Sequence, residues 1–132
     1  MSVGRIISGA LAKPERLTPE LQAAYEAPFP DESYKAGVAA FPLLVPVAAD
    51  FAAVPMLQRA RAKLKSWDKP ALVMFSDSDP VIIGGDKFFR RLIPTATRQP
   101  EITITDAGHF LQEEQGETIA AHILAFIERT PL

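Results

Sequence analysis

The fold class follows from residues 70–80, PALVMFSDSDP, which join a continuous apolar run to a cluster of aspartates. The run at 71–75 is typical of a parallel strand that is covered on both faces, because such a strand has no side facing solvent. The polar residues after it lie at the carboxyl end of the strand, where open α/β sheets place their functional groups. The sequence therefore predicts an α/β fold with a candidate site directly after this strand.

Downstream of this strand, the pattern alternates between helix and strand. Residues 86–93 have helical spacing, and Ile102 and Ile104 then alternate with threonines, which predicts a second strand. Apolar residues recur at helical spacing over 114–129 and predict a closing helix that packs on the sheet. Because a stable sheet usually needs three or more strands, we expect the chain to be incomplete by itself.

Upstream, short helices are expected. Thr18 can cap a helix near 19–26, whose first residue is a proline. A second helix can begin at Asp31 or Ser33, and Pro42 is expected to end it because proline disfavours helix in the preceding residue. A third helix follows.

Two parts of the chain are therefore expected. Residues 1–66 are predicted to form a lid of short helices, whereas residues 67–132 are predicted to form the sheet with its helices.

Composition excludes several classes of protein. The chain has 14 basic and 16 acidic residues and a formal net charge of -2, so we expect no nucleic-acid binding. It has no cysteine, which excludes a disulfide framework, a thiolate zinc site and a cysteine nucleophile. The apolar stretches are too short for a membrane span, and the first twelve residues match a secretory signal poorly. A cytoplasmic location is the default expectation.

An acid and a base are predicted at one edge of the sheet. Asp79 follows the first strand, and His109 follows the second strand in the stretch DAGHF. A carboxylate in this position can hold an imidazole in one tautomer and stabilise its protonated form. The separation of 30 residues suits one crossover between parallel strands, and Gly108 allows a sharp turn before the imidazole. The pair lacks a nucleophile.

Other polar residues are weaker candidates. Asp77 and Asp106 are rivals for the carboxylate role but can equally cap turns. His122 falls within the closing helix and is predicted to be a surface or partly packed residue.

No cofactor and no metal are expected. Gly84 and Gly85 lack the lysine and hydroxyl that complete a phosphate-binding loop, and no dinucleotide fingerprint is present. The carboxylates of this half do not have the spacing of a calcium loop or a metalloprotease, so we expect them to be solvated. These carboxylates are Asp77, Asp79, Asp86, Glu113 and Glu114.

Three segments are specific in combination: residues 17–37, which contain LTP, YEAPFPD and SYKAG; the pair Phe41 and Pro42; and residues 106–113, DAGHFLQE. Together they resemble the haloalkane dehalogenases of the α/β-hydrolase superfamily, over nearly the whole chain. The resemblance implies that residues 1–66 are a cap and that residues 67–132 are the carboxyl-terminal part of the hydrolase core.

The resemblance also implies roles for individual residues. Asp79 would be the catalytic acid and His109 the base that activates water. In this family an aspartate displaces halide to form an alkyl ester, which the activated water then hydrolyses. The positions that would line an apolar pocket for a small alkyl halide are Phe41, Pro42, Val45, Val81 and Ile82.

The chain departs from the family pattern upstream of the cap. It has no strand, nucleophile elbow and helix there, and no tryptophan beside a nucleophile to hold the halide. We therefore expect a dehalogenase-like fragment that acts only when an amino-terminal half supplies the nucleophile. Two alternatives stay open: a related epoxide or ester hydrolase, and a non-catalytic remnant or binding module that self-associates through an exposed strand edge.

Overall fold

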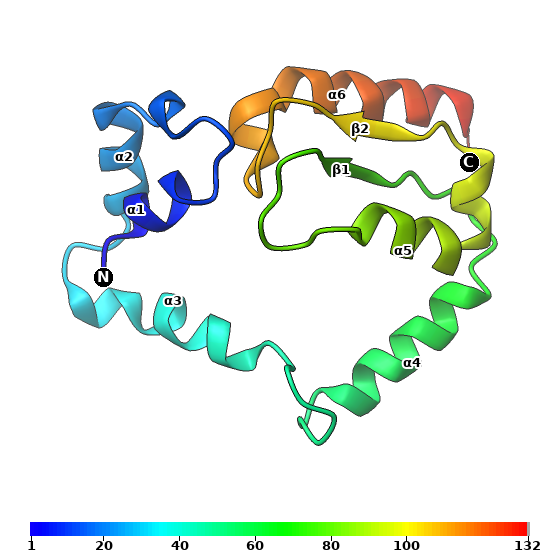
Figure 1. The fold of residues 1–132 in the computed structure, drawn as a ribbon, viewed down its shortest axis with the longest axis horizontal. Coiled ribbons are helices and arrows are strands. Elements are labelled where there is room, and N and C mark those ends of the chain that lie inside the picture. Colours follow the sequence, from blue (N-terminus) through cyan, green and yellow to red (C-terminus); the bar gives the residue numbers. More distant parts are fainter. Residues whose placement is uncertain (132) are drawn as a thin grey trace.

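The structure, a computed structural model, describes residues 1–131 and is shown in Figure 1. Helices precede the first strand, and strands and helices then alternate. The elements in chain order are α1 (Val3–Ser8), η1 (Pro14–Arg16), α2 (Pro19–Glu26), η2 (Glu32–Lys35), α3 (Ala36–Ala40), η3 (Phe41–Leu44), α4 (Val54–Lys65), β1 (Met74–Ser76), α5 (Gly85–Leu92), η4 (Pro94–Arg98), β2 (Ile102–Ile104) and α6 (Leu111–Arg129), where η marks a 3-10 helix.

The two strands form a parallel pair, in which Met74 lies opposite Ile102 and Ser76 lies opposite Ile104. The chain crosses from β1 to β2 through α5 and η4, as a parallel connection requires. The predicted α/β class is therefore confirmed, and both strands run so that their carboxyl ends meet at one edge.

The first strand is shorter and less covered than predicted. It begins at Met74 rather than at Ala71, because its one described partner, β2, begins opposite Met74. The prediction that both faces are covered is wrong for the described residues: Val73 is buried, but all three residues of β1 keep intermediate exposure.

Two apolar clusters hold the described residues together. Val73, on the approach to β1, packs with Leu92, Ile93 and Ala96 from α5 and η4. The second cluster belongs to the amino-terminal segment, which therefore has a small core of its own in addition to its surface helices. Its buried members are Val3, Ile7, Leu11 and Leu17, and Phe110 packs against them.

The first predicted helix is confirmed as α2, and its cap is the predicted one. The Thr18 hydroxyl accepts a hydrogen bond from the Leu21 N–H at 3.3 Å, and proline opens the helix. The Tyr25 hydroxyl donates to the Glu113 carboxylate of α6, and this bond raises the pKa of Tyr25 to about 12. Helix α2 is thereby attached to the closing helix.

The α-helix ends before Pro42, as predicted, but the residue before the proline does not leave the helical region. Asp31 begins the preceding turn by accepting the Ser33 N–H, and α3 ends at Ala40. However, Phe41 keeps helical angles (φ -55°, ψ -46°), and the chain continues as η3. Proline is tolerated there because it stands at the start of a new, tighter helix, where its missing N–H has no intrahelical partner to lose.

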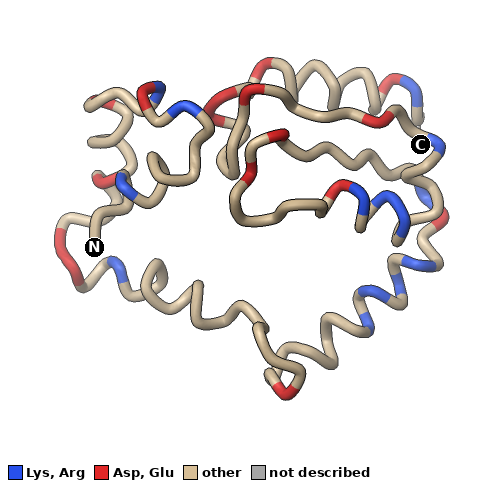
Figure 2. The backbone as a smooth tube through the Cα atoms, viewed as in Figure 1, with Lys and Arg blue, Asp and Glu red and all other residues tan. Residues whose placement is uncertain are grey.

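Residues 36–57, called the apolar arm below, lead away from the strands before α4 returns toward α5 (Figure 1). Asp50 is the one charged residue of this arm, as Figure 2 shows. Most of its large side chains are exposed, with Phe41 and Leu43 at 75% and Val47 at 88%. No helix within residues 1–131 combines the length and the apolar character needed to cross a membrane.

Candidate active site

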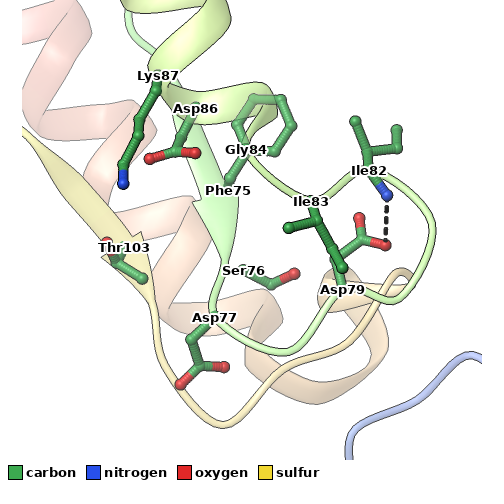
Figure 3. A pocket seen from close by; sticks show the side chains of 10 residues that line it. All are labelled: Phe75, Ser76, Asp77, Asp79, Ile82, Ile83, Gly84, Asp86, Lys87 and Thr103. Atoms are coloured by element: carbon green, nitrogen blue, oxygen red, sulfur yellow. Dashed lines mark hydrogen bonds between the residues drawn. The ribbon is translucent and has the colours of Figure 1, made fainter.

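Asp79 lies in the loop that follows β1 and caps the turn after itself. One oxygen of its carboxylate, Oδ1, accepts the backbone N–H groups of Val81 at 2.7 Å and Ile82 at 3.1 Å, and the bond from Ile82 is drawn in Figure 3. This is the bonding of an Asx turn, in which a short carboxylate organises the backbone that follows it. The carboxylate is consequently fixed relative to the end of the strand.

The carboxylate of Asp79 also contacts His109, as the sequence predicts. The His109 Nδ1 atom lies 3.0 Å from Oδ2 and 3.2 Å from Oδ1. An ionised carboxylate can only accept hydrogen bonds, so Nδ1 carries the hydrogen and donates it, which leaves Nε2 as the basic nitrogen. The Asp79 side chain is 10% exposed and the His109 side chain is 30% exposed, so the pair is shielded but open to solvent on the histidine side.

The environment keeps Asp79 ionised. Burial opposes its charge, but hydrogen bonds from His109 and from the N–H groups of Val81 and Ile82 outweigh burial and lower the pKa of Asp79 below its usual value. A carboxylate held as an anion beside an imidazole is what orientation of a general base requires.

The two loops that carry this pair are tied together by further bonds. They are residues 76–79 and 106–109, called the loop pair below. The Asp77 carboxylate accepts the N–H groups of Asp106 at 3.1 Å and Ala107 at 3.4 Å. The Ser78 N–H donates to the Ala107 carbonyl oxygen at 3.1 Å, and the Ser76 hydroxyl donates to the Gly108 carbonyl oxygen at 2.7 Å.

These bonds separate the roles of the three candidate carboxylates. Asp79 contacts the imidazole, whereas Asp77 links one loop to the other, and the bonds to Asp106 and Ala107 lower the pKa of Asp77 despite some burial. Asp106 has a positive φ of 59°, pairs with Lys13 at 2.9 Å and forms the bend before the histidine. Neither rival is placed to hold His109.

A pocket of about 280 Å³ opens beside Asp79, as Figure 3 shows. Asp79 and Ile82 line it together with Phe75 of β1, and Asp86 and Lys87 of α5 add polar groups. One of the predicted substrate residues, Ile82, therefore lines the same pocket as Asp79.

The other predicted pocket residues are far from enclosed. Phe41, Pro42 and Val45 lie at or after η3 and are exposed, Val45 at 57%. Val81 is 63% exposed. Within residues 1–131 these side chains present apolar surface and do not line the pocket beside Asp79.

Two of the carboxylates that are expected from the sequence to be solvated are largely buried, Asp79 at 10% exposure and Glu114. The Glu114 side chain has no exposed surface and accepts N–H groups from the distant Ala12 and Lys13 and from the nearby Gly108. A sequence signal existed: a glutamate in the first turn of a helix commonly bonds N–H groups near the start of that helix. No group of three potential metal ligands among histidines and carboxylates gathers within residues 1–131.

Curated proteins match the chain along nearly all of its length. A haloalkane dehalogenase of Psychrobacter cryohalolentis is 46% identical over 128 residues, which cover 97% of this chain and 41% of that protein. A haloalkane dehalogenase of Mycobacterium marinum is 37% identical over 126 residues, and haloalkane dehalogenase 1 of Mycobacterium bovis is 38% identical over 130. The chain is therefore similar to the carboxyl-terminal part of the haloalkane dehalogenases. No protein-family profile matches it.

The predicted relationship to the haloalkane dehalogenases and the α/β-hydrolase class are thereby confirmed. The chain spans about two fifths of the length of these dehalogenases, 41% and 42% in the relatives above. More than half of each dehalogenase therefore lies outside the match.

Proposed function

We propose that this chain supplies the acid and base of a haloalkane dehalogenase-like hydrolase whose nucleophile comes from an amino-terminal half. The observation that carries this proposal is the contact of 3.0 Å between the His109 Nδ1 atom and the Asp79 carboxylate, placed after two parallel strands. The sequence similarity to haloalkane dehalogenases supports the choice of alkyl halides as substrates.

The reaction would divide between the two halves. An aspartate oxygen of the amino-terminal half would attack the carbon that bears the halogen, and the halide would leave with the electron pair of the broken bond. The Nε2 atom of His109 would then take a proton from water, and the oxygen of that water would attack the carbonyl carbon of the ester. Cleavage of the ester bond would regenerate the aspartate and release the alcohol, whose oxygen takes the hydrogen left on the attacking oxygen. Asp79 would stabilise the imidazolium until Nε2 gives its proton to solvent.

The exposed apolar surface supports the same division. The apolar arm and Val81 expose large side chains that a soluble protein normally covers, and contact with an amino-terminal half would cover them. Residues 1–66 would then form the cap and residues 67–132 the carboxyl-terminal part of the core. Phe41, Pro42, Val45, Val81 and Ile82 would line the substrate pocket once it is enclosed.

Reconstitution tests this proposal. The amino-terminal half of the Psychrobacter cryohalolentis relative would be co-expressed with this chain, and halide release from a small alkyl bromide would be measured in the purified complex. We expect release from the complex and none from either half. His109→Gln should lower the rate at least about a hundredfold, since general-base catalysis contributes that much. His122 lies on α6, and His122→Gln is the matched control, which should retain the rate.

Two results would contradict the proposal: a stable complex that releases no halide, or one whose release survives His109→Gln. Hydrolysis of epoxides or esters by the same complex, without halide release, would favour the related hydrolases instead.

A second candidate function is self-association without catalysis. The specific observation in its favour is the apolar arm, in which Val47 is 88% exposed and Phe41 and Leu43 are 75% exposed. Sedimentation velocity distinguishes the two. A dimer that persists when the amino-terminal half is added in excess favours self-association, whereas replacement of the dimer by the two-part complex favours the hydrolase.

A further inference from the structure

Glu114 stands five residues after His109, at the start of α6, yet its side chain is turned away from solvent. Figure 1 shows the start of α6 beside the segment that follows α1. A buried carboxylate is costly unless its oxygens accept hydrogen bonds, so its partners show what it stabilises.

Three backbone N–H groups converge on this carboxylate. The Oε2 atom accepts Gly108 at 2.7 Å and Ala12 at 3.0 Å, and the Oε1 atom accepts Lys13 at 2.8 Å. Gly108 directly precedes the histidine, whereas Ala12 and Lys13 are about a hundred residues away in sequence. One side chain thus joins the amino-terminal segment to the loop that carries the base.

The next peptide group, between Gly108 and His109, is held from two other directions. The Gly108 carbonyl oxygen accepts the Ser76 hydroxyl at 2.7 Å, and the His109 N–H donates to the Ala10 carbonyl oxygen at 2.7 Å. Only glycine fits at 108, because a Cβ atom there would meet the backbone of Ala10 and Ala12. The backbone of the histidine is therefore held from β1, from residues 10–13 and from α6.

Arg16 adds a fourth connection. Its Nη1 atom donates to the carbonyl oxygens of Asp106 and Glu114, each at 3.2 Å, and lies 3.9 Å from the Glu114 carboxylate. The cation thereby spans the bend before the histidine and the first turns of α6.

We propose that Glu114 is a positioning residue for His109, which fixes the imidazole by holding the Gly108 peptide against residues 10–13. Its meaning for catalysis rests on the proposed function, but the structural claim does not. Asp79 orients the ring from its Nδ1 side, and Glu114 fixes the backbone from which the ring extends. Both constraints are needed, because a ring held at one nitrogen still moves with its own backbone.

The electrostatics agree with this role. Burial disfavours the charge of Glu114, but bonds from Gly108, Ala12 and Lys13 and the nearby Arg16 cation outweigh burial and lower the pKa of Glu114. An ionised carboxylate suits the site because all three contacting groups are donors.

Nuclear magnetic resonance of the ¹⁵N-labelled chain tests the proposal. Glu114→Gln keeps the shape of the side chain but turns one acceptor into a donor that faces N–H groups. We expect the resonance of the His109 Nδ1 proton to be lost or shifted in this variant, at a temperature where circular dichroism shows it to be folded. Glu117→Gln removes an exposed carboxylate from the same helix and should leave the resonance unchanged.

A lower melting temperature alone does not support the proposal, since a merely structural role would produce it. An unchanged His109 resonance in folded Glu114→Gln would overturn it. If that variant does not fold, Glu114→Asp serves instead, because it keeps the charge and shortens the reach. We expect partial loss of the resonance, and an unchanged resonance would again overturn the proposal.

The reconstituted complex separates this inference from the proposed function. In an active complex, Glu114→Gln should lower kcat about 10- to 100-fold with little change in KM, since misplacement of the base affects the chemical step. An active complex that tolerates the variant would overturn the positioning role alone. A complex that is inactive with the native chain would refute the proposed function and leave the resonance test of Glu114 standing.

Discussion

The loop pair and the apolar arm belong to the same chain, but they differ in how many of their polar and apolar groups find partners within residues 1–131. In the loop pair, the Asp77 and Asp79 carboxylates both accept backbone N–H groups, and every bond comes from within residues 1–131. In the apolar arm, α3 and η3 contain no buried residue, and Phe41, Leu43 and Val47 are mostly exposed.

The difference teaches which interactions are local. Hydrogen bonds between two strand-end loops need only the crossover that brings the strands together, so this chain can form them by itself. The large apolar side chains of the arm would need a second surface to cover them, and no other part of residues 1–131 covers Phe41, Leu43 or Val47. The contact between Asp79 and His109 therefore forms within this chain although the apolar arm remains uncovered.

Acidification should have the largest effect on stability, because it protonates the carboxylates that bond the loop pair, whereas the apolar arm has a single carboxylate, Asp50. The folded state lowers the pKa values of Asp77, Asp79 and Glu114, so their contribution to stability is complete above the ordinary carboxyl pKa of about 4. This contribution to stability is lost as the pH falls from about 4 through the lower pKa values that these carboxylates have in the folded state. Urea unfolding at several pH values should show the free energy of unfolding decreasing over this range, more than any single substitution achieves. A free energy independent of pH below 4 would contradict the bonding of the loop pair.

Two substitutions, one in the loop pair and one in the apolar arm, should differ in the same direction but with smaller effects on stability. Asp77→Ala removes the acceptor of two N–H groups that link the loops, and it should lower the free energy of unfolding by about 1 kcal/mol. Phe41→Ser, at a side chain that is 75% exposed, should change it by less than about 0.5 kcal/mol. Urea titration measures both, and a reversed order would show that the arm, not the loop pair, stabilises this chain.

Much of the framework was predictable because it depends on local pattern. The Thr18 cap, the β2 strand and the closing helix follow from capping chemistry and periodicity, and Asp79 and His109 follow from the ends of parallel strands. The limits of β1 were not predictable, since a strand ends where its partner ends.

The links around the base were harder to predict. The bonds from Ala12 and Lys13 to Glu114 join segments about a hundred residues apart, which no local pattern encodes. The same holds for the contact of Ala10 with the His109 N–H. Burial of Glu114 depends on tertiary contacts, so the sequence does not distinguish Glu114 from the solvated carboxylates near it.

The most direct test of the central claim is the Nδ1 proton of His109, observed by ¹H–¹⁵N spectroscopy in this chain without an amino-terminal half. We predict a hydrogen-bonded, downfield resonance that disappears in Asp79→Asn, because a contact of 3.0 Å to an ionised carboxylate produces it. Its absence from the native chain, or its survival in Asp79→Asn, would show that the acid and base are not assembled by this chain alone.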